Sequence, residues 1–178
     1  AAARLSRFIV LTKSDRKDWE KVVPNVTSIY NPLTFKSDRV AELQNRRCIA
    51  IGRLEPQKNF KDLVTAWVDV DKRFPDWRLE IYGKGHQEKA LRKQIDQNGL
   101  TGKVLLMGSS DDIRGKMLES SCLVMSSAYE GFPMVLLEAV ETGLPMVSYD
   151  CPKGPSEIII DGESGFLVRP GDTAALSR

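Results

Sequence analysis

The sequence predicts a doubly wound α/β fold, with a mainly parallel sheet and helices on both of its faces. Apolar runs of four to six residues alternate with amphipathic segments along most of the 178-residue chain. These runs lack the in-out alternation of a strand exposed on one face, so we expect strands that are covered on both faces. Such alternation with short connections implies right-handed crossovers and a parallel sheet, which binds ligands at the carboxyl ends of its strands.

The first 45 residues are expected to be a lead-in or linker segment from a missing amino-terminal neighbour, packed on a main domain of residues 46–178. Within this segment, residues 8–12 and 26–30 are predicted strands, and Ser14 begins a short helix between them. Asn31-Pro32 forms a turn, and a polar stretch follows it.

Six strands are predicted in the main domain, at residues 48–52, 79–83, 104–108, 122–126, 145–149 and 165–168. Between the first two, an apolar stripe predicts a helix that ends before Pro75. The members of this stripe are Leu63, Ala66, Trp67, Val70 and Phe74. We expect Asn59 to cap this helix, with Asp62 as the acidic partner of a capping box. Asp111-Asp112 is expected to cap a later helix.

Composition argues against several partners. The net charge is only +2 and the basic residues are spread along the chain, which disfavours a nucleic-acid partner. The odd number of cysteines, Cys48, Cys122 and Cys151, favours a reducing cytoplasm. No apolar stretch approaches the roughly 20 residues that span a bilayer, so we expect a soluble chain. Asp69-Val70-Asp71 imitates a metal-binding Asp-x-Asp motif, but Val70 lies on the apolar helix stripe, so both aspartates are expected to face solvent.

Glu130 and Glu138 bracket the most informative stretch, which lies between a predicted strand and a predicted helix. Glu130, in the loop, has the chemistry to accept hydrogen bonds from sugar hydroxyls. Glu138, a turn or two into the helix, is placed to bind a ribose diol as the acidic residue of dinucleotide-binding folds does. Either glutamate taken alone is better explained as a solvated carboxylate near a helix end. The Gly-Phe-Pro between them favours the functional interpretation.

The residues between these acids predict a phosphate-binding helix start. Pro133 suits the first helical turn, where its missing N–H costs nothing, and Gly131 allows a ligand to approach the backbone closely. The N–H groups of Met134 and Val135 would then be free. Free amides with the positive end of the helix dipole behind them form a receptor for a phosphate group.

Arg53 and Lys58 supply the opposite charge, at the carboxyl end of the first strand of the main domain. A departing nucleoside diphosphate develops negative charge on its oxygens, and two fixed cations stabilise that charge without a metal. As isolated residues they would be ordinary surface cations. Their position at a strand end favours the functional interpretation.

Together these motifs resemble the retaining glycosyltransferases of the GT-B fold, in particular glycosyltransferase family 4, or group 1. The resemblance is carried by Glu130 and Glu138 with seven residues between them, and by Gly52-Arg53 followed by Lys58-Asn59. Runs at residues 81–85, 104–108 and 161–168 add to it, and it extends from about residue 8 onward. It implies that the chain is the carboxyl-terminal, Rossmann-like half of a GT-B fold, which binds a nucleotide sugar.

The resemblance also implies a role for each site residue. Glu130 would be the catalytic residue that holds the transferred sugar, Glu138 would bind the ribose, and Arg53 with Lys58 would bind the diphosphate. The loop and helix start that meet the sugar and phosphates would comprise Gly131, Phe132, Pro133, Met134 and Val135. The base would lie between strand-end loops at Gly83, Gly85, Met107 and Gly108. No metal ion or other cofactor is expected, and the donor would be a UDP- or GDP-linked sugar.

The activity implied is transfer of a hexose-type sugar, with retention of configuration, to a glycan or lipid-linked acceptor. The acceptor domain is expected to be missing, together with its glycine-rich loop and histidine, so the fragment should be inactive alone. The only histidine, His86, is interpreted as a loop residue. A cytoplasmic enzyme of polysaccharide biosynthesis, peripheral at the inner face of the membrane, is expected from the resemblance.

Other interpretations stay open. A non-catalytic module that binds a nucleotide or glycan, or a GT-B epimerase or phosphorylase, would share the fold. Gly83-Lys84-Gly85 imitates the start of a dinucleotide fingerprint, but Glu88 replaces its third glycine, which disfavours a nicotinamide or flavin enzyme. Residues 151–157 either shape the pocket near the diphosphate or form a turn with a helix start at Pro155. Cys151 has no histidine nearby in the sequence to activate it as a nucleophile.

Overall fold

The main sheet of the protein is parallel and, among the described residues, has six strands. The structure is a computed structural model that describes residues 6–33 and 35–178. The strands are β3 (Arg47–Ile51), β4 (Arg78–Tyr82), β5 (Val104–Gly108), β6 (Cys122–Met125), β7 (Met146–Tyr149) and β8 (Gly165–Val168). They lie in the order β5-β4-β3-β6-β7-β8, and all neighbours are parallel. The apolar runs therefore predicted every strand to within one residue at each end.

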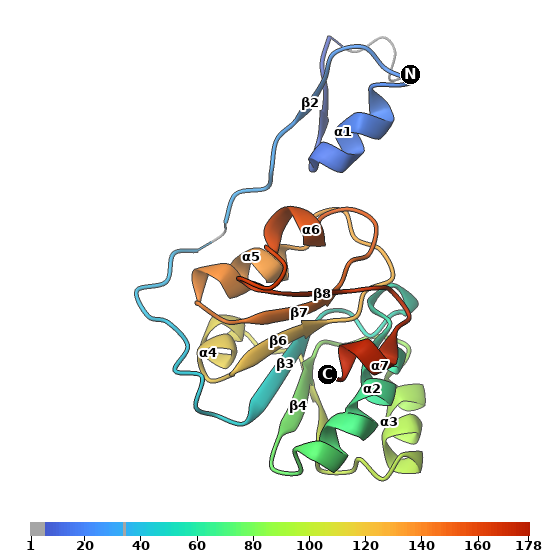
Figure 1. Cartoon of the computed structure of the whole chain (residues 1–178), viewed down its shortest axis with the longest axis vertical. Helices are drawn as coiled ribbons and strands as arrows, with labels where there is room; N and C mark the ends of the chain where they lie inside the picture. The colour runs from blue at the N-terminus through green and yellow to red at the C-terminus, as the bar shows by residue number, and fades with distance from the viewer. Residues whose placement is uncertain (1–5, 34) are drawn as a thin grey trace.

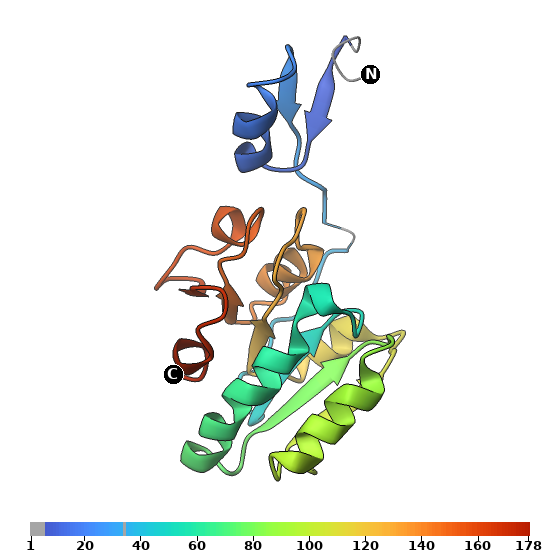
Figure 2. The same ribbon diagram turned by 90° about the vertical axis from the view of Figure 1, so that its right-hand side faces the viewer.

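Helices cover both faces of this sheet (Figure 1, Figure 2). One face carries α2 (Phe60–Arg73), α3 (Glu88–Gln97) and α7 (Thr173–Leu176), and the other carries α4 (Ile113–Leu118), α5 (Met134–Glu141) and α6 (Pro155–Ile158). Each layer has its own hydrophobic cluster, the first including Leu63, Trp67 and Leu91 and the second Met117, Leu136 and Ala139. Full burial of one such large side chain stabilises the fold by roughly 1.5–3 kcal/mol. The doubly wound prediction is confirmed.

A small unit precedes the main sheet. β1 (Phe8–Val10) and β2 (Val26–Ser28) pair in parallel as a separate two-stranded sheet, and α1 (Lys13–Trp19) connects them. Its buried cluster consists of Val10, Val23 and Val26. From residue 35 onward, the chain that leads to the main domain passes beside α5 in Figure 1.

Two helices begin differently from the prediction. Thr12 caps α1 by accepting a hydrogen bond from a helical amide at 2.9 Å, so Ser14 lies inside the helix. Asn59 precedes α2 as predicted, but its backbone is left-handed, with a φ of 48°, because it also ends the 3-10 turn η2 (Pro56–Lys58). Its side chain donates to Asp62 Oδ2 at 2.8 Å and caps no helix amide. The capping-box prediction is therefore wrong.

The apolar stripe of α2 is confirmed at Leu63, Ala66 and Trp67, which are all buried. Phe74 does not belong to it, since it lies beyond the last helical residue and is 48% exposed. Asp112 caps α4 as predicted, because its carboxylate accepts a backbone hydrogen bond at 2.8 Å.

The Asp-x-Asp sequence lies on α2. Asp69 is exposed and pairs with Lys72 at 3.2 Å. Asp71 is half-buried rather than solvent-facing, because Lys103 lies 3.6 Å from it. Within residues 6–33 and 35–178, no three or more histidine, cysteine or acidic side chains are grouped so as to hold a metal ion. Nor does any helix described here have the length and apolar character needed to span a membrane.

Candidate functional site

The loops that carry the predicted site meet at the topological switch point of the sheet. β3 and β6 are neighbours although β4 and β5 lie between them in the chain. The helices change from one face of the sheet to the other here, and open α/β sheets bind ligands in the crevice that results. Arg53 and Lys58 follow β3, and Glu130 follows β6. The fold therefore brings the segments that carry these residues to one edge of the sheet.

Lys58 and Glu130 form an ion pair between the segments that follow β3 and β6. Lys58 Nζ lies 2.6 Å from Glu130 Oε1, and the two side chains are 18% and 8% exposed. Charges this far from water are tolerated only when they are paired, so each side chain compensates the burial of the other. Sequence reasoning anticipated both side chains as ligands of a donor but not their contact with each other.

Three hydrogen bonds brace the loop after β6 against η2. The Ala128 N–H donates to the Gln57 carbonyl at 2.8 Å, and the Ser126 hydroxyl donates to the Lys58 carbonyl at 3.0 Å. The Gln57 side-chain amide donates to the Tyr129 carbonyl at 3.1 Å. The two partners of the ion pair are thus held by their backbones as well as by their charges. Sequence analysis missed Gln57 and Ser126, because all three bonds join segments distant in the chain.

A second network fixes the residue after Lys58. The Asp62 carboxylate accepts a hydrogen bond from the Asn59 side-chain amide at 2.8 Å and another from the Tyr149 hydroxyl at 3.3 Å. Tyr149 lies on β7 with no exposed surface, and burial with the nearby charge of Asp62 raises the pKa of its hydroxyl. The left-handed turn that aims Lys58 toward the crevice is therefore tied to the core of the main domain.

Free amides stand at the start of α5, four residues after Glu130 in the chain. Pro133 is the residue before the helix, with φ −74° and ψ 94°, so its predicted place is wrong by one position. The N–H groups of Met134 and Val135 donate to no acceptor in the part of the chain that the structure describes. Such groups at the positive end of a helix dipole attract an anion. Gly131 is exposed, and a Cβ there would meet nothing within 4 Å, so space is open beside the loop.

Arg53 and Glu138 form no hydrogen bond or salt bridge with the Lys58–Glu130 pair within the described ranges. Arg53 is exposed just beyond the end of β3. Glu138 is half-buried in the second turn of α5, and burial raises the pKa of its carboxyl. A partly buried carboxyl group without a cation beside it is more typical of a binding site than of a structural contact. That the two residues share a ligand with Lys58 stays a prediction.

The glycines of the expected base pocket have a structural explanation. Gly83 has a φ of +147°, and a Cβ there would lie 1.8 Å from the Gly52 carbonyl oxygen. A Cβ on Gly85 would lie 2.4 Å from the Leu54 carbonyl oxygen. These close approaches let the loops after β3, β4 and β5 interlock, and Gly83 N–H donates to the Gly108 carbonyl at 2.8 Å. Met107 precedes Gly108 on β5 and is 44% exposed. A role for these loops in base binding stays a prediction.

Two side chains near the site are poor candidates for catalysis. Cys151 is 2% exposed, and its burial, together with the charge of Glu130, raises the pKa of its thiol to about 12. The thiol stays protonated at neutral pH and is a poor nucleophile, which agrees with the sequence interpretation. His86 is an exposed loop residue, as expected, with its Nδ1 2.5 Å from Glu55 Oε2.

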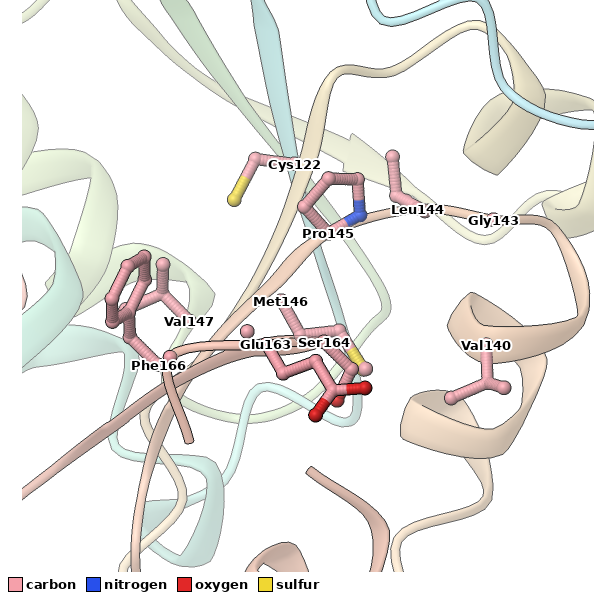
Figure 3. A pocket seen from close by; sticks show the side chains of 12 residues that line it. Cys122, Val140, Gly143, Leu144, Pro145, Met146, Val147, Glu163, Ser164 and Phe166 are labelled. Carbon is pink, nitrogen blue, oxygen red and sulfur yellow. The ribbon is translucent and has the colours of Figure 1, made fainter. Parts of the chain in front are cut away.

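A pocket of about 560 Å³ opens at the opposite edge of the sheet (Figure 3). Its walls include Cys122, Met146 and Gly165, which begin β6, β7 and β8. The exposed ring of Phe166 and the carboxylate of Glu163 border it. None of the predicted site residues lines this pocket, so it is separate from the switch-point crevice.

The fold is that of a doubly wound α/β domain, and Lys58 and Glu130 lie at its topological switch point. Residues 34–178 match the family model described as glycosyl transferases group 1. The chain therefore belongs to that family. This outcome confirms the group 1 resemblance and the GT-B fold class.

Relatives and solved structures agree with this assignment. The amylovoran biosynthesis glycosyltransferase AmsD of Erwinia amylovora is 38% identical over 172 residues, which are 91% of this chain and 48% of AmsD. The lipopolysaccharide 1,6-galactosyltransferase of Salmonella typhimurium is 31% identical over 156 residues, 83% of this chain and 43% of that protein. A mutant of TarM from S. aureus, solved with fondaparinux, alpha-GlcNAc-glycerol and UDP, superposes with a TM-score of 0.91 at 25% identity, over 99% of this chain and 36% of TarM. The chain thus spans less than half of each of these proteins.

Proposed function

We propose that this chain is the donor-binding half of a retaining glycosyltransferase of family 4. The enzyme transfers a hexose-type sugar from a UDP- or GDP-linked donor to a glycan or lipid-linked acceptor. The observation that carries the proposal is the buried Lys58–Glu130 pair, 2.6 Å apart at the switch point, with the free amides of α5 following in the same loop. A cation, a carboxylate and a helix start together offer what a pyrophosphate and a sugar require.

Binding of the donor is expected to rearrange the ion pair. A diphosphate offers Lys58 a second anion, and the free amides of Met134 and Val135 offer that diphosphate further donors. Glu130 is then released toward the hydroxyls of the transferred sugar. Arg53, which has no partner among the described residues, would complete the charge balance at the exposed side of the diphosphate.

Catalysis is proposed to rest on positioning and charge stabilisation rather than on covalent attack. The transition state resembles an oxocarbenium ion, and the leaving diphosphate takes the proton of the incoming acceptor hydroxyl on the same face of the sugar. Lys58 stabilises the negative charge that develops on the diphosphate, with no metal ion taking part. In the full-length enzyme, Glu130→Ala should lower turnover far more than donor affinity, and unchanged turnover would refute this role for Glu130.

The acceptor is proposed to bind to a domain that precedes this one, of which residues 1–45 would be the end. The acceptor class is supported by the relatives, whose names specify amylovoran biosynthesis and galactose transfer to lipopolysaccharide. The UDP that accompanies the TarM mutant supports a nucleotide-linked donor. A cytoplasmic enzyme that is peripheral at the inner face of the membrane would fit such acceptors.

Calorimetric titration of the chain with UDP- and GDP-sugars tests the proposal. Lys58→Met should weaken binding at least about tenfold, since a hydrogen bond to a charged group contributes roughly 1.5–3 kcal/mol. Lys72→Met is the matched control, because Lys72 is 69% exposed on the outer surface of α2. Donor binding that Lys58→Met leaves unchanged, or binding of NAD in place of sugar nucleotides, would contradict the proposal. Binding without any transfer by the full-length protein would identify a non-catalytic module instead.

A further inference from the structure

The carboxylate of Glu157 on α6 joins the main domain to the preceding unit by three hydrogen bonds. Its Oε2 accepts a hydrogen bond from Lys13 N–H at 2.9 Å, and its Oε1 accepts one from Ser14 N–H at 2.9 Å. The Tyr30 hydroxyl donates to Oε2 at 3.0 Å. Figure 1 shows α6 on the side of the main domain that faces α1. Both carboxylate oxygens are thus used between the two parts of the chain.

Glu157 is held as a fixed anion by these contacts. Burial opposes its ionisation, but the hydrogen bonds from Lys13, Ser14 and Tyr30 outweigh burial, so the pKa of the carboxyl lies below its ordinary value. The two amides belong to the first turn of α1, where the helix dipole favours a negative charge. Hydrogen bonds to an ionised carboxylate are also stronger than neutral ones. The position of Tyr30 is therefore well determined by Glu157.

The ring of Tyr30 stacks on Phe132 in the donor-binding loop. The two ring centroids are 5.2 Å apart and the planes are inclined by 14°. Phe132 is 8% exposed, whereas Tyr30 is 42% exposed, so the tyrosine ring covers the phenylalanine from the solvent side. An aromatic pair in this geometry adds specificity of position as well as buried area.

The other side of the donor-binding loop rests on residues 152–154. A Cβ on Gly154 would lie 2.4 Å from Pro133 Cδ, and Glu130 N–H donates to the Pro152 carbonyl at 3.3 Å. Lys153, between them, pairs with Asp15 at 3.2 Å and with Asp18 at 2.5 Å, both on α1. The segment that supports the loop is therefore also fastened to the preceding unit.

Resting on the proposed function, we propose that Tyr30 and Glu157 are positioning residues for the nucleotide donor, because they hold Phe132 and with it the free amides that follow. Neither residue touches the donor in this account. Glu157 orients the Tyr30 ring, the ring fixes Phe132, and Phe132 fixes the helix start at Met134. The preceding unit thereby contributes to donor affinity through the loop.

Calorimetric titration with UDP or GDP, whichever the unaltered chain binds, tests this coupling. Tyr30→Leu removes the stacked ring and should weaken binding about three- to tenfold. Tyr30→Phe keeps the stacked ring but loses the hydrogen bond to Glu157, so it should weaken binding less than Tyr30→Leu does. Glu157→Gln removes an anion that accepts three hydrogen bonds and should weaken binding to a similar degree. Glu163→Gln, an exposed carboxylate before β8, is the matched control and should bind as the unaltered chain does.

The outcomes separate this inference from the proposed function. If the unaltered chain binds none of these nucleotides, the proposed function fails. If it binds them and both Tyr30→Leu and Glu157→Gln bind as tightly as Glu163→Gln, the positioning role is overturned. Equal weakening by Tyr30→Phe and Tyr30→Leu would also overturn it, because the stacked ring would then carry no part of the effect. Urea denaturation of each variant should show that the main domain is folded in the absence of urea, and weakened binding by a variant that is already unfolded there would contradict a positioning role.

Discussion

The pair formed by Lys58 and Glu130 should make a large contribution to stability that depends on both partners. Glu130→Gln keeps the shape of the side chain but leaves Lys58, which is 18% exposed, opposite a neutral amide. At 2.6 Å, two unit charges attract by roughly 6 kcal/mol at an effective dielectric constant of about 20, and desolvation offsets much of that. Removing one partner of a buried pair costs about 3–5 kcal/mol. Because this pair keeps some exposure, we expect a loss of roughly 2–4 kcal/mol.

A double-mutant cycle measured by urea denaturation tests this expectation. Glu130→Gln and Lys58→Met should each destabilise the protein, and the double variant should lose at least about 1 kcal/mol less than the sum of the two losses. The exposed pair of Asp69 and Lys72 is the control, with an expected coupling below about 1 kcal/mol. Losses for the buried pair that add to within about 0.5 kcal/mol would refute the reasoning, since they would mean that the two charges act independently.

Three further predictions concern the loops around the crevice. Gly83→Ala should destabilise the protein by more than about 2 kcal/mol in urea denaturation, because the new Cβ would lie 1.8 Å from a carbonyl oxygen. Gly99→Ala is the control: its Cβ would meet nothing within 4 Å, so only the left-handed φ of +69° opposes it, at a cost of about 1 kcal/mol. Cys151 should resist iodoacetamide at pH 8 in the folded protein, because its thiol is buried with a pKa of about 12, and rapid alkylation at that position, read by mass spectrometry, would contradict the placement. Glu138→Gln should raise the free energy of unfolding at neutral pH. The folded-state pKa of Glu138 is raised, so its ionisation on going from acid to neutral pH costs stability, and the advantage of the glutamine variant should vanish below the ordinary titration range of a carboxyl group.

The strands and the layered α/β arrangement could be predicted from local patterns in the chain. Each apolar run, such as residues 104–108, is long enough for one buried strand and too short for a helix. Amphipathic segments between the runs predict helical crossover connections, which imply a parallel sheet and the edge where ligands bind. The same logic placed Lys58 and Glu130 at strand ends, because it needs only the end of each strand.

The contacts within the site were beyond sequence reasoning, because they join residues distant in the chain. Nothing local to Lys58 or Glu130 indicates that the two side chains meet at 2.6 Å. The left-handed backbone of Asn59 ends a 3-10 turn, and the Asn59 side chain donates to Asp62, which also accepts a hydrogen bond from Tyr149 on a distant strand. Arg53 and Glu138 are the opposite case. Their positions in the sequence indicate a binding role, but the partner that they are expected to contact is a ligand.

The central claim is that Lys58 and the start of α5 hold a pyrophosphate. Phosphorus-31 NMR of UDP or GDP, recorded as the chain is added, observes those phosphates directly. The account predicts that both phosphorus resonances shift or broaden with the unaltered chain and with Lys72→Met, and that Lys58→Met greatly reduces the effect. Undiminished shifts with Lys58→Met, or resonances that none of the three proteins perturbs, would contradict it.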